Sequence, residues 1–253
     1  MITPQKEAPE IARELGIGRL FLKREDLHPY GSHKGRSIPL MIDMKVAEGA
    51  RDFVISSSGN AALAALRHIQ KKNAETGLIN DEIKSRKKSK EPAPDPSGGL
   101  TLTILVGSNM NKAKRAALEA ELVDPRIKIE EVPRPLQALF NLIHAGKESL
   151  RQSTDDEALL GYKTLAHEIA STPDLSAVFI GTSSGTTAQA LADYFAEHGI
   201  GAAVHIVQTR GVSPIARNFA AEEYEPETSL ADAIVDKVAH RGDKLSEALK
   251  KSG

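Results

Sequence analysis

The chain has 253 residues but no cysteine and no tryptophan, and aromatic residues make up only 4% of it. Without cysteine there are no disulfides, thiolate nucleophiles, cysteine-ligated zinc sites or cysteine-held iron–sulfur clusters. An excess of charge of one sign is also missing, because 33 Lys and Arg oppose 34 Asp and Glu. No overall positive field therefore attracts nucleic acid or an anionic membrane, and we expect neither as a partner.

Long apolar runs are missing too. No run approaches the ~20 residues that a membrane-spanning helix needs. Charges at Lys6, Glu7 and Glu10 stand where a secretory signal would have its apolar stretch. We therefore expect a cytoplasmic location. With 40% hydrophobic and 26% charged residues, the composition is that of an ordinary globular protein.

What the chain does have is an alternation of short apolar segments with longer segments of helical periodicity. Strands are predicted at 20–22, 53–55, 100–106, 128–132, 177–180 and 204–207. Helices are predicted at 37–48, 61–70, 112–122, 136–148, 159–170, 187–198 and 229–249. Such βαβ units predict an α/β fold with a parallel sheet, whose ligands bind in the loops that follow the strands.

Residues 71–99 interrupt this alternation. They contain few apolar residues, a basic run KSRKKSK at 84–90, and then EPAPDPSGG. We interpret the segment as a flexible surface insertion. A basic run can bind nucleic acid or a membrane, but no aromatic residues interleave here, so a solvated loop is favoured and no function is assigned.

The loop after the strand at 177–180 has the composition of a phosphate-binding turn. It reads Gly-Thr-Ser-Ser-Gly-Thr-Thr over 181–187 and opens a helix. A helix N-terminus presents unpaired N–H groups and a partial positive charge, and glycine lets the backbone approach an anion. An ordinary N-cap and turn would have the same composition, so both interpretations stay open at this point. The loop lacks the lysine of a P-loop and the spacing of a dinucleotide site.

The loop after the strand at 53–55 is similar. It reads Ser-Ser-Ser-Gly-Asn over 56–60 before a helix of small residues. Its N–H groups and hydroxyls could hold a carboxylate, and the Asn60 amide could donate to a phenolate-like oxygen. A plain helix cap explains the same residues equally well.

The loop after the first predicted strand carries a lysine just before a helix, in the sequence KREDLHPYGSHKGR over 23–36. If Lys34 were desolvated, its pKa would fall and it could form a Schiff base with an aldehyde cofactor, although most lysines are solvated surface charges. His28 and His33 are five residues apart without a nearby carboxylate pair, which is a poor pattern for metal ligands, and we expect no metal site.

Taken in order, five motifs resemble the fold type II pyridoxal-phosphate-dependent enzymes of the tryptophan synthase β-like superfamily, which includes threonine synthase, threonine dehydratase and cysteine synthase. They are Thr3-Pro4, LFLKREDLHPYGSHKGR, SSSGNAALAAL, GYKTLAHEIA and VFIGTSSGTTAQAL. The resemblance implies a two-domain parallel-sheet α/β fold and a homodimer. The larger, cofactor-binding domain would comprise 1–44 and 147–253, and the smaller, mobile domain 45–146.

The resemblance also implies roles for individual residues. Lys34 would form the Schiff base with pyridoxal 5′-phosphate, and Asn60 would meet the phenolic oxygen of the cofactor. The substrate carboxylate would be held by Ser57, Ser58 and Gly59. The phosphate would be held by Gly181, Thr182, Ser183, Ser184, Gly185 and Thr186, although the family loop usually has more glycine. The family's hydroxyl residue for the pyridine nitrogen has no good match, since Ser252 is a poor substitute, so the chain is expected to be C-terminally shortened.

The activity implied is that of a lyase on a hydroxy amino acid or its phosphate ester, similar to threonine synthase or threonine dehydratase. It would work by Schiff-base formation, Cα proton abstraction and β or γ elimination. One alternative is a cysteine synthase-like β-replacement enzyme, although its compact G-T-G-G-T loop is missing. Another is a non-catalytic cofactor- or partner-binding relic or fragment. A third, an anion-binding α/β module without the cofactor, requires all three loops to be only caps and turns.

Overall fold

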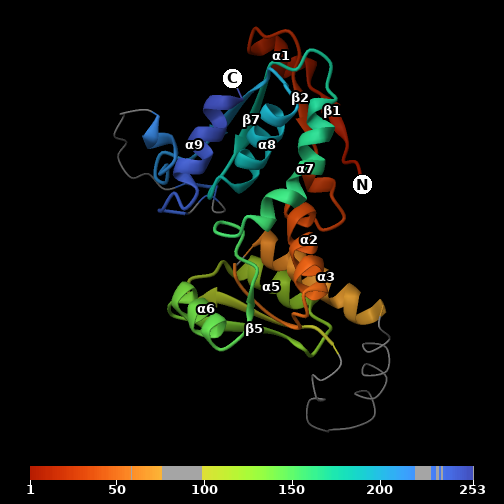
Figure 1. The fold of residues 1–253 in the computed structure, drawn as a ribbon, viewed down its shortest axis with the longest axis vertical. Helices are drawn as coiled ribbons and strands as arrows, with labels where there is room; N and C mark the ends of the chain where they lie inside the picture. Colours follow the sequence, from red (N-terminus) through yellow and green to blue (C-terminus); the bar gives the residue numbers. More distant parts are fainter. Residues whose placement is uncertain (58, 76–98, 220–228, 232–233, 235, 253) are drawn as a thin grey trace. The chain divides into compact units, whose positions relative to one another are not determined.

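A computed structural model describes residues 1–57, 59–75, 99–219, 229–231, 234 and 236–252 (Figure 1). The chain divides into two compact units, essentially Thr3–Arg151 and Gln152–Gly253. Each unit contains its own parallel sheet and core. The predicted grouping of 1–44 with 147–253 in a larger domain concerns the placement of these units on each other, and it stays a prediction.

The first unit opens with a small antiparallel sheet. Strand β1 (Gln5–Glu7) pairs with β2 (Phe21–Lys23), helix α1 (Pro9–Glu14) connects them, and the one-turn helix η1 (Glu25–Leu27) follows. Only β2 is predicted from the sequence. All three residues of β1 are exposed, so no apolar alternation marks it as a strand, and its backbone pairing alone defines it.

The main sheet of this unit is parallel, with strand order β5-β4-β3-β6. Its strands are β3 (Asp52–Ser56), β4 (Thr101–Gly107), β5 (Ile127–Val132) and β6 (Glu148–Ser149). The two central strands are buried along most of their length, as the continuous apolar runs predict. Every strand predicted from the sequence is present, with ends that differ by at most one residue.

Four helices accompany this sheet: α2 (Lys34–Ala47), α3 (Asn60–Glu75), α5 (Lys112–Glu121) and α6 (Pro135–His144). Helices α3 and α6 pack on its strands, and α2 packs on α3. The prediction of a helix continuing to 148 is wrong. Gly146 has a left-handed φ of +97°, a conformation that ends helices, and the chain then enters β6. The core is formed by apolar side chains of α2, α3, α6 and the central strands, among them Ile38, Met41, Leu66, Ile69, Ile104 and Leu139.

The predicted insertion at 71–99 begins later than expected, because Lys71–Glu75 complete α3. Asn73 is buried and bonds both backbone groups of Leu100, accepting from its N–H at 2.8 Å and donating to its carbonyl at 2.9 Å. The remaining insertion residues, 76–98, lie outside the described residues. The base of the insertion is therefore fixed to the start of β4.

The second unit is a single βαβ crossover flanked by helices. Strands β7 (Ala177–Gly181) and β8 (Ala203–Val207) are parallel, and α8 (Thr186–Glu197) connects them. Helices α7 (Glu157–Ala170) and α9 (Gly242–Lys251) pack against α8 (Figure 1). The one-turn helix η2 (Ala216–Asn218) follows β8. The core includes Leu165, Ala166, Leu191, Phe195 and Leu245.

The predicted helix at 229–249 is wrong in its first half. Of that segment, the described residues before Gly242 are not helical, and α9 begins only at Gly242. Arg241 immediately before it is turned inward and buried, where it binds backbone carbonyls, so the chain cannot continue as an amphipathic helix there. Within the described parts of the chain, no helix is long and apolar enough to cross a membrane.

Candidate active site

Lys34 is the first residue of α2, and the loop before it packs closely on the first turn of the helix. A Cβ atom on Gly35 would lie 2.4 Å from His28 Nδ1 and 2.5 Å from Tyr30 Cβ, so only glycine allows this contact. The Lys34 N–H donates to Ser32 Oγ at 3.3 Å. The G-S-H-K-G sequence thus fixes the backbone from which the half-buried Lys34 side chain extends.

A buried ion pair between Arg36 and Glu25 also holds the first turn of α2. Arg36 donates to both carboxylate oxygens of Glu25, at 2.7 and 2.8 Å, and to Thr3 Oγ1 at 3.0 Å. Burial alone would raise the pKa of Glu25, but the hydrogen bonds from Arg36 and Thr3 outweigh it and lower that pKa. Arg36 therefore anchors α2 to η1 and to the N-terminal segment through a charged pair.

His33 precedes the lysine and is neutral at physiological pH. Burial lowers the pKa of His33 to about 3, and the neighbouring Lys34 ammonium lowers it further. No cluster of three histidine or carboxylate side chains suited to a metal ion occurs among the residues that the structure describes. His28 instead accepts from the Tyr30 N–H through Nδ1 at 3.2 Å.

The loop at 56–60 lies at the carboxyl end of β3 and leads directly into α3. Ser57 Oγ accepts from the Gly59 N–H at 3.3 Å, the local turn expected of a serine before a helix. Asn60 is the first residue of α3 and its side chain is exposed. Ser58 lies outside the described residues. Lys34 and Asn60 thus stand at the N-termini of two helices that pack on each other in the first unit.

The loop from 181 to 186 lies in the second unit, between β7 and α8. Gly185 has a φ of +85°, and a Cβ there would lie 2.6 Å from Leu245 Cδ2. Its N–H donates to Thr182 Oγ1 at 3.0 Å. Because glycine precedes α8, no side chain caps this N-terminus within the described loop. The first N–H groups of α8 have no partner inside the helix, which suits them to an anion.

The hydroxyl groups of this loop differ in what they bind. Ser183 Oγ donates to the Asp236 carboxylate at 3.0 Å and accepts from the Asp236 N–H at 3.0 Å. Ser184 Oγ and Thr186 Oγ1 share a hydrogen bond of 2.9 Å at the start of α8. The Ser183 hydroxyl is therefore engaged by a loop outside the turn, and the N–H groups at the start of α8 are the candidate donors for an anion.

Buried Arg241 supports the same helix end and is missed by the sequence analysis. Its guanidinium donates to the Gln152 carbonyl at 3.0 Å and to Gln189 Oε1, in the first turns of α8, at 3.2 Å. Thr186 Oγ1 donates to the same Gln152 carbonyl at 3.2 Å. The guanidinium also pairs with the Asp156 carboxylate at 2.8 Å, so Arg241 braces the N-terminal end of α8 as half of an ion pair. No sequence pattern singles out Arg241, because its partners Gln152 and Gln189 lie far from it along the chain.

The left-handed backbone at Gly185 gives a testable prediction. Gly185→Ala should lower the free energy of unfolding of the second unit by about 3 kcal/mol, from left-handed strain of about 1 kcal/mol plus overpacking against Leu245. Gly199 has a φ of +64° with nothing within 4 Å, so Gly199→Ala measures the strain alone. Urea titration of both variants checks this, and equal losses would contradict the close packing of the turn.

These donors fit pyridoxal phosphate, the group that the resemblance implies. The N-terminus of α8 suits a phosphate dianion. Lys34 supplies a primary amine for an aldehyde, and its neighbour His33 stays neutral. The Asn60 side chain is exposed at the start of α3, where its amide can donate a hydrogen bond.

Comparisons with known proteins agree with this chemistry. The model of the family described as "Pyridoxal-phosphate dependent enzyme" matches residues 2–253. Threonine synthase of Mycobacterium tuberculosis (strain ATCC 25618 / H37Rv) is 25% identical over 190 residues, which are 74% of this chain and 46% of that protein. L-serine dehydratase/L-threonine deaminase of Mus musculus is 39% identical over 62 residues, 24% of this chain and 19% of that protein.

Solved structures share the fold. Threonine deaminase isoform 2 from Solanum lycopersicum superposes with a TM-score of 0.73 at 18% identity, covering 98% of this chain and 62% of that one. A pyridoxal 5′-phosphate-dependent aspartate racemase gives the same TM-score at 20% identity, covering 98% and 70%. The chain spans about half the length of the threonine synthases it matches. The predicted family, fold and cofactor are confirmed, and the chain belongs to the pyridoxal-phosphate dependent enzymes.

Proposed function

We propose that this chain is a pyridoxal-phosphate-dependent lyase that acts on a hydroxy amino acid or its phosphate ester. One arrangement supports this proposal. Lys34 begins α2 where Gly35 lets the preceding loop pack closely, and α8, which follows the parallel strand β7, has no side-chain cap at its N-terminus. The relatives named threonine synthase and L-serine dehydratase/L-threonine deaminase support the substrate class.

Lys34 would perform two tasks at one atom. Its Nζ would hold the cofactor covalently until the substrate amine displaces it, and the freed Nζ would then take the proton from the substrate Cα. When bound, the cofactor supplies a ring that stabilises negative charge at that carbon. His33 beside Lys34 is neutral, so it adds no second positive charge next to Nζ.

The remaining groups would bind and orient. The first N–H groups of α8 would hold the phosphate, and Arg241 would keep that helix end in place through Gln189. Ser57, Ser58 and Gly59 would hold the substrate carboxylate, and Asn60 would donate to the phenolic oxygen. Fixing both ends of the substrate–cofactor pair sets the direction of the Cα–H bond relative to Lys34 and excludes water from it. We also propose a homodimer, which sedimentation at micromolar concentration tests.

Assays of four amino acids test the reaction. Loaded with pyridoxal phosphate, the protein should turn over at least one of O-phosphohomoserine, threonine and serine, and should do so faster than O-acetylserine. Turnover of O-acetylserine alone would instead support the β-replacement alternative. A protein that binds the cofactor but turns over none of the four would support the non-catalytic alternative and contradict the proposal.

A further inference from the structure

Three side chains from different elements of the first unit form a hydrogen-bonded relay. The Tyr30 hydroxyl lies 2.8 Å from His68 Nδ1, and His68 Nε2 lies 3.0 Å from Asp43 Oδ1. Tyr30 belongs to the loop before Lys34, Asp43 to α2 and His68 to α3. The His68 residue is only 6% exposed. We call Tyr30, His68 and Asp43 the tyrosine relay.

The ionisation states of Asp43, His68 and Tyr30 decide which atom donates in each hydrogen bond of the tyrosine relay. Burial would raise the pKa of Asp43, but hydrogen bonds from His68 and Lys72 outweigh it and lower that pKa, so the carboxylate is ionised. Burial lowers the pKa of His68, which is therefore neutral at physiological pH. The carboxylate accepts from Nε2–H, which leaves Nδ1 as the acceptor for the tyrosine hydroxyl. Burial raises the pKa of Tyr30, so the hydroxyl keeps its proton to donate.

The relay connects the two helices whose first residues are Lys34 and Asn60. Tyr30 packs on the first turn of α2, since a Cβ on Gly35 would lie 2.5 Å from Tyr30 Cβ. The adjoining turn is closed by the Gly31 N–H, which donates to the His28 carbonyl at 2.6 Å. A bond from Tyr30 to buried His68 therefore fixes this loop against α3, while Asp43 fixes the same histidine to α2.

We propose that His68 is a positioning residue for Lys34, acting through Tyr30 to hold the loop that precedes the lysine. The inference rests on the proposed function in one respect, because it takes Lys34 as the residue that binds the cofactor. None of the three relay side chains needs to touch cofactor or substrate. Their effect is to keep the Lys34 and Asn60 helix starts in one relative position before the cofactor arrives.

Hydrogen exchange on the cofactor-free protein tests the positioning itself. Tyr30→Phe removes a single oxygen and should speed exchange about tenfold at the amides of Tyr30, Gly31 and Lys34. Amides in the middle of α3, such as those of Leu66 and Ile69, should keep their protection. His68→Leu should reproduce this local pattern, because it removes both bonds while filling the buried space. Equal acceleration throughout α2 and α3 would overturn the proposal, since it would indicate a general loss of stability.

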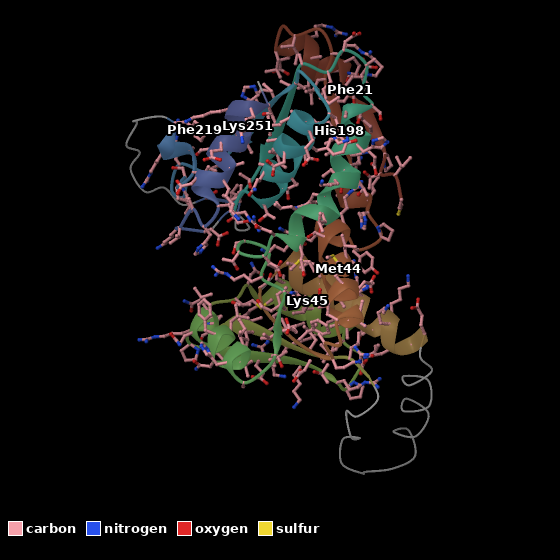
Figure 2. All side chains as sticks on the ribbon, in the orientation of Figure 1. Phe21, Met44, Lys45, His198, Phe219 and Lys251 are labelled. Atoms are coloured by element: carbon pink, nitrogen blue, oxygen red, sulfur yellow. The ribbon has the colours of Figure 1, made fainter. Side chains whose placement is uncertain are left out.

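A surface pair in the second unit provides a matched control. The Tyr194 hydroxyl lies 2.9 Å from His167 Nδ1, the same kind of bond at an exposed site. The Tyr194 ring also stacks on His198, which is labelled in Figure 2. Tyr194→Phe should leave exchange in the Lys34 loop unchanged.

Titration with pyridoxal phosphate supplies the second readout. Tyr30→Phe and His68→Leu should weaken cofactor binding about tenfold, while Tyr194→Phe leaves it unchanged. Unchanged affinity in both relay variants would overturn the role toward Lys34. Failure of the wild type to bind cofactor would contradict the proposed function instead, and the exchange pattern would still decide whether the relay holds the loop. Unfolding of Tyr30→Phe itself would also overturn the proposal.

Discussion

Lys34→Ala is expected to abolish turnover, with a loss of at least about 10³-fold in kcat, and to weaken retention of pyridoxal phosphate. The reason is that Nζ is the proposed covalent anchor and also the proposed base for the Cα proton. Removing one amine removes both tasks. The variant should fold normally, because Lys34 is half-buried at a helix start and its backbone contacts with Ser32 remain. Steady-state kinetics and cofactor absorbance after desalting measure the two losses.

Lys45→Ala is the matched control, since Lys45 lies near the other end of α2 and is labelled in Figure 2. Its ammonium is 3.9 Å from the Glu148 carboxylate, a weak and partly exposed pair. This variant should keep both turnover and cofactor. If Lys34→Ala retained turnover at the wild-type rate, another amine would have to be the base, and the assignment of Lys34 would be wrong.

Arg36→Leu is expected to lower the free energy of unfolding by about 3 kcal/mol. The loss arises because the substitution leaves the Glu25 carboxylate, only 15% exposed, without its bidentate partner. The double variant Arg36→Leu/Glu25→Leu removes both charges and should recover much of that loss. Urea unfolding of the wild type, the single variant and the double variant measures the difference. A single variant as stable as the double one would contradict a buried, mutually compensating pair.

The pH dependence of this pair has a definite sign. Because the folded protein lowers the pKa of Glu25, the carboxylate stabilises the fold above its unfolded pKa and loses that contribution as pH falls through the folded pKa. The stability advantage of the wild type over Arg36→Leu should therefore be full at neutral pH and narrow below about pH 4. An advantage that stayed constant down to pH 2 would show that the carboxylate is not the titrating partner.

Strands could be predicted where the hydrophobic pattern of the sequence directly reflects burial in the folded protein. β3 and β4 are short continuous apolar runs in the sequence because both of their faces are buried, so the sequence marked them within one residue. β1 could not be found this way, since three exposed polar residues become a strand only by pairing with β2. The break at Arg241 was missed for a related reason, because its partners at 152–155 lie far away in sequence.

The candidate site shows the same division. Lys34 and the loops at 56–60 and 181–186 could be predicted because each is a contiguous motif placed after a strand. The residues that hold them could not. Tyr30 and His68 are 38 residues apart, and no spacing rule connects them. Arg241 carried no signal until its buried contacts with Gln152 and Gln189 were known. Local sequence therefore indicates the loops, whereas the side chains that hold them in place are identified only by contacts between residues far apart in the sequence.

Every role proposed for this chain depends on the binding of pyridoxal phosphate by Lys34. The most direct test is to load the purified protein with the cofactor, record the visible absorption spectrum before and after borohydride reduction, and map the modified peptide by mass spectrometry. We expect a visible band that reduction removes, with the cofactor mass on the peptide that contains Lys34 and no band in Lys34→Ala. A cofactor mass on a different lysine, or no reducible band in the wild type, would contradict this expectation.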